Sequence, residues 1–156
     1  MKNALGTVFA LFALANLGLA ADNTLGTWKY NTAKSKPASG MSPIKDLTVT
    51  REAAGDAVKV SAKGEREDGS KIDSTTTLKY DGKDVEVTGS GVTWDTTSAK
   101  QVNANTLTET RSKKDGKYQT TVRTSVSKDG KTMTSTSKGT NADGKPFTSV
   151  AVFDKQ

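Results

Sequence analysis

The chain contains no cysteine and no histidine among its 156 residues. Without cysteine it can form no disulfide bond, and no cysteine follows the N-terminal segment to carry the lipid of a lipoprotein. The absence of both residue types also removes the usual general base, the thiol nucleophile and the soft metal ligands of enzymes. We therefore expect no enzymatic activity, no metal and no cofactor.

Carboxylates are present, but their placement argues against catalysis. A carboxylate pair would have to be brought together in a cleft to act as acid and base. Five of the twelve aspartates instead occupy sequence positions that turns explain, where the side chain bonds to the local backbone; these are Asp68, Asp81, Asp115, Asp129 and Asp143.

Large apolar side chains are scarce. Residues 21–156 number 136 (156 minus 20), and only 19 of them are Leu, Ile, Val or Phe. That share is typical of disordered chains, which normally also carry a high net charge. Here the net charge of these residues is only +5 (22 cations minus 17 acids), and 23 of them are threonine. Because threonine suits a half-wet pleated surface, the composition is compatible with a polar β protein.

The N-terminus predicts a cleavable signal peptide over residues 1–20. One cation, Lys2, precedes an apolar run from Ala4 to Leu19, and the run ends in the small-x-small sequence Gly18-Leu19-Ala20. The run is interrupted and too short to span a bilayer, which takes about 20 apolar residues. We therefore predict cleavage near Ala20 and a periplasmic or secreted protein, with residues 21–156 as a single domain.

Asp-Gly pairs followed by alternating segments predict a series of β-hairpins. Asp-Gly tolerates the positive φ angles of two-residue hairpin turns, and five such pairs punctuate the chain. Between the turns, side chains alternate with a period of two, and no segment after residue 20 has a helical period. We expect nine or ten strands, two of the short segments merging, over 25–31, 44–53, 57–65, 70–80, 83–88, 91–95, 99–103, 106–114, 117–128, 131–139 and 146–154.

A long run of hairpins leaves exposed strand edges unless the sheet closes on itself. The sequence therefore predicts an all-β fold, an antiparallel up-and-down (meander) β-barrel of about 8–10 strands. The segment 32–43, which contains Pro37, Gly40 and Pro43, is the only long connection.

The first predicted strand carries a family resemblance. Gly26-Thr27-Trp28-Lys29 resembles the Gly-x-Trp signature that calycins, the lipocalin and fatty-acid-binding-protein superfamily, carry on their opening strand. The stretch from Leu25 to Asn31 also resembles small exported bacterial proteins. The resemblance implies that Gly26 and Trp28 are structural, with Trp28 closing one barrel end beneath a cation from a late strand. Arg111 and Arg123 are the candidates for that cation.

Two departures from this family bear on the ligand. Fatty-acid-binding proteins insert a helical hairpin as a lid between their first two strands, whereas the 32–43 connection is too short and too rich in Pro and Gly for two helices. They also commonly carry Arg-x-Tyr on the last strand to hold the ligand carboxylate, and here that stretch reads Ala151-Val152-Phe153. We therefore expect a calycin-like barrel without a helical lid.

One segment places charges on the inner face. If Leu107 points into the barrel, then Glu109 and Arg111 do so too. They could form a buried ion pair, which is costly to desolvate, or anchor a polar or anionic ligand. Alternatively, both charges could lie at the wet rim of the barrel. We favour the rim, because burying unpaired charges is expensive.

The leading functional hypothesis is an exported lipocalin-like binding protein for a small apolar or amphipathic molecule. Too few large apolar residues are available to fill a wide barrel, so we expect an internal cavity with polar patches. The predicted lining residues are Leu47, Val49, Ile72, Leu78, Leu107, Glu109, Arg111, Tyr118, Val122 and Phe147. The alternative is a non-catalytic envelope or secreted interaction module with a filled barrel.

Other partners are less compatible with the composition. The lysines are scattered through turns with acids close by, so we interpret them as a solvated surface and expect no nucleic-acid partner. Two Trp, three Tyr and two Phe after residue 20 cannot supply the aromatic girdles of an outer-membrane barrel, so we expect a protein that is not membrane-embedded. We further expect a monomer.

Overall fold

The computed structural model describes residues 21–39 and 41–156. The predicted signal at residues 1–20 lies outside the described part of the chain. Within the described residues the chain forms no helix and eleven strands: β1 (Gly26–Tyr30), β2 (Ile44–Ala54), β3 (Ala57–Arg66), β4 (Lys71–Leu78), β5 (Val85–Glu86), β6 (Thr88–Ser90), β7 (Thr96–Asn103), β8 (Thr106–Ser112), β9 (Gln119–Val126), β10 (Thr132–Thr140) and β11 (Pro146–Lys155).

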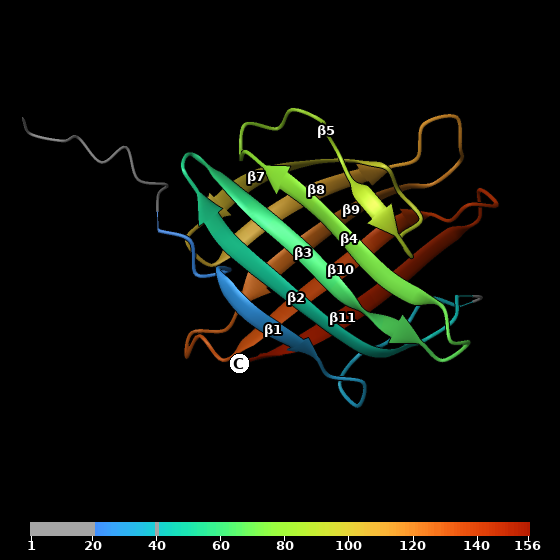
Figure 1. The fold of residues 1–156 in the computed structure, drawn as a ribbon, viewed down its shortest axis with the longest axis horizontal. Helices are drawn as coiled ribbons and strands as arrows, with labels where there is room; N and C mark the ends of the chain where they lie inside the picture. The colour runs from blue at the N-terminus through green and yellow to red at the C-terminus, as the bar shows by residue number, and fades with distance from the viewer. Residues whose placement is uncertain (1–20, 40) are drawn as a thin grey trace, which may run out of the picture.

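The strands form one antiparallel sheet that curls into a nearly closed barrel (Figure 1). The order is β5-β7-β8-β9-β10-β11-β1-β2-β3-β4-β6, so the last strand pairs with the first. β5 and β6 follow one another in the chain but lie at opposite edges of the sheet, β5 beside β7 and β6 beside β4. Residues 85–90 therefore span the seam, where Thr76 Oγ1 donates a 2.8 Å hydrogen bond to the carbonyl oxygen of Glu86. The predicted all-β meander barrel is confirmed.

The strand count exceeds the expected nine or ten at this seam. The expected strands at 83–88 and 91–95 are replaced by two short strands: β5, which pairs with β7, and β6, which pairs with β4. Residues 91–95 form a loop instead of a strand, and Gly91 there has a φ of +80°. That left-handed conformation interrupts an extended segment, and the alternation pattern does not reveal it.

A glycine also shapes the barrel wall. A Cβ on Gly64 of β3 would lie 2.1 Å from the carbonyl oxygen of Asp46, which no side chain tolerates. The register of β2 against β3 shifts at the same place, between Ile44 and Asp46. Close backbone approach at a glycine beside a bulge is the usual way for a sheet to bend into a barrel.

Trp28 lies at the centre of the apolar core and is fully buried. Its indole Nε1 donates a 2.8 Å hydrogen bond to the carbonyl oxygen of Thr24, which satisfies the one polar atom of the ring. The core cluster around it also contains Leu47, Ile72, Val126, Met133 and Phe153.

The cation over Trp28 is Lys155, with Nζ 5.0 Å from the ring centroid. The prediction of Arg111 or Arg123 is therefore wrong. Lys155 lies on β11 directly opposite Trp28 on β1, so both side chains leave the sheet on the same side. Arg123 occupies an exposed, outward position of β9, and Arg111 lies over Trp94 instead.

The connection between β1 and β2 carries no lid. Its described residues, 31–39 and 41–43, contain turns and a single bridge from Lys36 to Val150 on β11, and no helix. These residues therefore agree with the barrel without a helical lid that the sequence predicts. A search of the described residues for a helix long and apolar enough to cross a membrane finds none.

Candidate ligand-binding cavity

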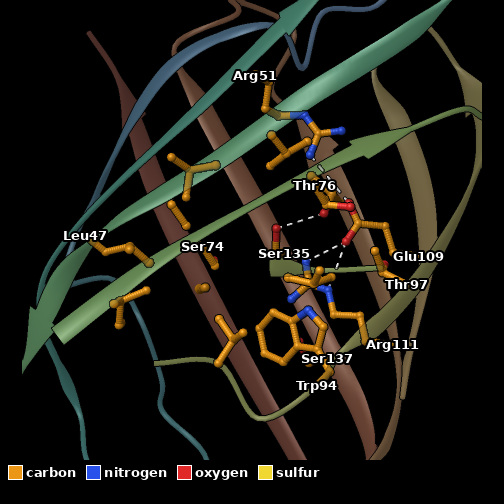
Figure 2. A pocket seen from close by; sticks show the side chains of 18 of the residues that line it. Leu47, Arg51, Ser74, Thr76, Trp94, Thr97, Glu109, Arg111, Ser135 and Ser137 are labelled. Atoms are coloured by element: carbon orange, nitrogen blue, oxygen red, sulfur yellow. Dashed lines mark hydrogen bonds and ion pairs between the residues drawn. The ribbon is translucent and has the colours of Figure 1, made fainter. Parts of the chain in front are cut away.

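The barrel interior encloses a cavity of about 190 Å³ (Figure 2). Its apolar side chains come mainly from β2, β3, β4 and β11. Its polar side chains come from β4, β8 and β10, with single residues from β2, β3, β7 and β9. The apolar side chains include Leu47, Val49, Ile72, Leu78, Val92, Met133 and Phe153, and the polar ones include Arg51, Thr97, Glu109, Arg111, Ser135 and Ser137. The interior is therefore amphipathic and unfilled.

A second cavity of about 140 Å³ adjoins the first beneath the β1–β2 connection. Pro37, Ala38 and Met41 of that connection line it, together with Tyr118 and Phe147 from the opposite wall. The two cavities are neighbours, because six residues line both of them: Ile44, Arg66, Trp94, Arg111, Ser137 and Ala151.

Arg66 braces the region where the cavities meet. Its Nη1 donates a 3.0 Å hydrogen bond to the carbonyl oxygen of Ser42, and its Nη2 donates one of 3.2 Å to that of Gly91. One side chain therefore ties the β1–β2 connection to the loop before β7. This link holds together two irregular segments that no sheet ladder joins.

Glu109 is the centre of the charged part of the lining. Its carboxylate accepts hydrogen bonds from Arg111 Nε at 3.0 Å and Arg111 Nη2 at 2.5 Å, and from Arg51 Nη1 at 3.5 Å (Figure 2). The side chains of Arg51 and Glu109 are 5% and 4% exposed. Two arginines thus share one buried carboxylate, and the trio carries one net positive charge into the cavity wall.

The N-terminal segment before β1 extends this network. Arg51 Nε donates to Thr24 Oγ1 at 3.1 Å, and Arg51 Nη2 donates to the Tyr80 hydroxyl oxygen at 3.2 Å. Asp22 accepts hydrogen bonds from the Tyr80 hydroxyl at 2.5 Å and from Thr24 Oγ1 at 2.6 Å. Residues that directly follow the predicted signal therefore fix the guanidinium of Arg51 in place.

Burial and pairing oppose each other in the pKa values of this network. Burial alone would raise the pKa of Glu109, but the charges of Arg111 and Arg51 outweigh it and hold that pKa below its ordinary value. Burial alone would lower the pKa of Arg51, but its interactions with Glu109 and Tyr80 outweigh burial and raise that pKa above its ordinary value. Both groups are therefore ionised at neutral pH.

A row of aromatic rings continues from Arg111 towards the second cavity. The guanidinium carbon of Arg111 lies 4.6 Å from the centroid of Trp94. Trp94 stacks on Tyr118 at 5.9 Å between centroids, and Tyr118 packs against Phe147 at 6.1 Å. Because a cation over an indole face is favourable, Trp94 holds the Arg111 side chain against the cavity wall.

One polar atom of the lining has no hydrogen-bond partner in the described chain. Thr97 is 3% exposed, and its Oγ1 is buried and unpaired. Thr97 lies opposite Arg111 in the β7–β8 ladder and lines the first cavity. A buried hydroxyl without a partner is costly, so a polar atom in the cavity beside Arg111 would satisfy it.

The structure distributes the predicted lining residues over three places. Six line the first cavity, and Arg111, Tyr118 and Phe147 line the second. Leu107 and Val122 are fully buried and are not among the lining residues of either cavity. The six residues on the first cavity are Leu47, Val49, Ile72, Leu78, Glu109 and Arg111.

The preference for Glu109 and Arg111 at the wet rim is wrong. Glu109 is 3% exposed, and Arg111 is partly buried beside it. The preference for the rim rests on the free-energy cost of burying an unpaired charge. Here the charges are paired, since Glu109 accepts hydrogen bonds from both Arg111 and Arg51. That partner set includes Arg51, which the sequence interpretation did not consider as a site residue.

Arg51, Tyr80 and Trp94 are lining or network residues that sequence reasoning missed. Arg51 shares its strand face with Leu47 and Val49, and Tyr80 continues the face of Ile72 and Leu78, so the alternation held the signal for both. Trp94 lies in the loop at 91–95, where alternation does not apply.

The arrangement suits binding of a small molecule. Within the described residues no group of three or more Asp, Glu, His or Cys side chains is placed to hold a metal. In the described part of the chain, Glu109 is the one carboxylate that lines either cavity, and its oxygens accept hydrogen bonds from two arginines.

By sequence, the chain matches no protein-family model and no curated protein. Among solved structures it is similar to a Schistosoma mansoni fatty acid binding protein in complex with arachidonic acid, with a TM-score of 0.58 and 16% sequence identity. The match covers 88% of this chain and 98% of that chain. At this identity the likeness concerns the fold alone, and it shows that the chain forms an antiparallel barrel similar to that of this fatty acid binding protein.

Proposed function

We propose that this protein is an exported binding protein that holds one small amphipathic or apolar molecule inside its barrel. The observation that carries the proposal is the internal cavity, which is lined by apolar side chains such as Leu47 and Phe153 together with Arg111 and Thr97. Such a pocket buries a ligand's hydrocarbon part and orients its polar end through a few placed groups. The similar barrel from Schistosoma mansoni, which binds arachidonic acid, supports the same use of this fold.

The cavity volume points to a short ligand. Pockets for drug-sized molecules occupy roughly 300–1,000 Å³, and an apolar cavity of about 150 Å³ holds benzene. The main cavity here has about 190 Å³, and the adjoining one adds about 140 Å³. We therefore expect a compact ligand, with its polar end beside Arg111 and its apolar part against Leu47 and Phe153.

The signal-peptide pattern supports a place outside the cytoplasm, periplasmic or secreted, and we include export in the proposal. The absence of histidine and cysteine from the sequence favours a carrier over an enzyme. The ligand would then be a molecule present in the envelope or in the medium.

Isothermal titration calorimetry with sodium butanoate, octanoate and hexadecanoate tests binding and the size limit together. We expect octanoate to bind with one molecule per chain and hexadecanoate to bind no more tightly. Affinity that keeps rising to hexadecanoate contradicts the size limit. Absence of binding by all three acids and by neutral octanol contradicts the carrier function.

A cavity-filling variant locates the binding. Ser137 lines both cavities, so Ser137→Phe places a ring where they meet. We expect octanoate binding to be lost, while the fold tolerates the extra volume at a cost of about 1–3 kcal/mol. Thr77→Phe, at an exposed outward position of β4, is the matched control and keeps binding.

A further inference from the structure

The net positive charge of the protein lies on one half of the barrel. Residues 21–95 contain 11 cations and 12 acids, a net of −1, whereas residues 96–156 contain 11 cations and 5 acids, a net of +6. The second half forms β7 to β11, which are consecutive in the sheet. The excess of positive charge in the second half reflects the scarcity of acids there, since each half contains 11 cations.

The outer surface of β8, β9 and β10 is uniform in chemistry. These strands lie side by side on the wall opposite β2 and β3 (Figure 1). Twelve of its outward positions are half-buried or exposed, and nine of these twelve are Thr or Ser, with one Gln and two cations. We name this surface the hydroxyl wall: Thr108, Thr110, Ser112, Gln119, Thr121, Arg123, Ser125, Thr132, Thr134, Thr136, Lys138 and Thr140.

The polar groups of the hydroxyl wall are available to a partner. Within the described residues, the side-chain hydroxyl of Thr140 bonds to the backbone oxygen of Lys117, and the other eight hydroxyls make no hydrogen bond to protein. Arg123 and Lys138 form no ion pair with any described residue, whereas lysines on the opposite wall, such as Lys63 and Lys79, are paired with aspartates.

The hydroxyl wall continues into a further basic cluster at one end. The side chain of Lys117 lies against the β10–β11 turn, since a Cβ on Gly144 would come within 3.0 Å of its Cδ. Lys145 directly follows that glycine, and neither lysine forms an ion pair within the described chain. Cations therefore run from the middle of the wall to its edge.

We propose that the hydroxyl wall binds an acidic polysaccharide, one that carries carboxylate or sulfate groups along a chain of sugar hydroxyls. Arg123 and Lys138 pair with the anionic groups, and the threonine and serine hydroxyls exchange hydrogen bonds with the sugar hydroxyls. Threonines on a sheet are stiff at χ1, so a rigid array of hydroxyls loses little entropy when a chain binds across it.

Two other polyanionic partners fit the hydroxyl wall less well. Its outward positions carry no aromatic ring, and single-stranded nucleic acid relies on such rings for base stacking. They carry no apolar side chain either, and a protein that inserts into an anionic membrane surface needs an apolar face. The surface offers hydroxyls, one amide and cations, which complement the hydroxyls and anionic groups of a charged carbohydrate.

Fluorescence polarisation with labelled heparin and polygalacturonate oligosaccharides tests the proposal. We expect salt-dependent binding, because screening weakens contacts between exposed charges. Arg123→Gln/Lys138→Gln should weaken binding by about tenfold, since it removes two charge-assisted contacts. Lys59→Gln/Lys63→Gln, at exposed positions of β3, changes the net charge equally and should leave affinity within about twofold.

A second pair of variants separates sugar recognition from simple charge attraction. Thr110 and Thr121 lie opposite each other on the wall. Thr110→Val/Thr121→Val preserves the charge and the β-branched shape, and it should weaken binding by several-fold, whereas Thr77→Val on β4 should have no effect. Unchanged affinity of the double valine variant overturns the proposal. So does tighter binding to oligothymidine or to phosphatidylglycerol vesicles than to either polysaccharide.

Discussion

Arg51 and Glu109, which are 58 positions apart in the sequence, form an ion pair inside the barrel with 3.5 Å between Nη1 and Oε1. Arg51 belongs to β2 and Glu109 to β8, strands that are not neighbours in the sheet. The pair therefore crosses the interior and links opposite walls. It also connects the N-terminal segment, through Thr24, to the cavity lining at Arg111.

Loss of the Glu109 charge should destabilise the protein at neutral pH. Glu109→Gln leaves Arg51 and Arg111 without their shared anion, and removing one partner of a buried pair costs about 3–5 kcal/mol. Urea denaturation at pH 7 measures this loss. A cost below about 1 kcal/mol, the value of an exposed pair, would contradict the burial of the network.

The same variant should change the response to acid. The folded-state pKa of Glu109 is held below the ordinary glutamate value of about 4.5, so its stabilising contribution is complete above about pH 4.5 and is lost as the pH falls through the lower folded value. The difference in unfolding free energy between wild type and Glu109→Gln should therefore narrow below about pH 4.5. A constant difference down to pH 3 would show that the ionisation of Glu109 is not linked to folding.

Arg51 and Glu109 should also be energetically coupled. In a double-mutant cycle, Arg51→Met/Glu109→Leu should be less destabilised than the sum of the two single variants, because neither charge is left facing a missing partner. We expect a coupling energy of about 1–3 kcal/mol in urea denaturation. Additive single effects would mean that the two side chains act independently.

Asp22 should stabilise the barrel although it precedes the first strand. Asp22→Ala removes the acceptor for the Tyr80 hydroxyl and for Thr24, and leaving such buried donors unpaired costs about 1–3 kcal/mol. Asp84→Ala, at an exposed position, is the control and should be neutral. Equal stabilities of the two variants would rule out a role of Asp22 in the network.

Trp94 should report on cavity occupancy. It lines both cavities, whereas Trp28 belongs to the sealed core. If octanoate binds beside Arg111, the fluorescence change should vanish in Trp94→Phe and persist in Trp28→Phe. The reverse pattern would place the ligand elsewhere.

Local sequence features predict most of this fold. The Asp-Gly turns and the period-two segments between them place nearly every strand, because hairpins depend on neighbouring residues. Strand parity likewise predicts that Glu109 and Arg111 face inward with Leu107. The family resemblance predicts a structural Trp28 with a cation from a late strand over its ring.

The missed features depend on contacts that close the barrel. Lys155 is the cation over the Trp28 ring because β1 pairs with β11, and these strands are at opposite ends of the chain. The burial of Glu109 depends on its ion pair with Arg51 across the interior. The alternation of side chains along one strand cannot identify a partner on a distant strand.

Native mass spectrometry of the protein, recovered without denaturation from its producing cells or their medium, tests the central claim most directly. We predict one small molecule bound per wild-type chain, of a mass that fits the two cavities, and none bound to Ser137→Phe purified in the same way. A wild-type chain without adduct that also takes up no octanoate or octanol, or an adduct equally present in Ser137→Phe, would contradict a ligand held inside the barrel.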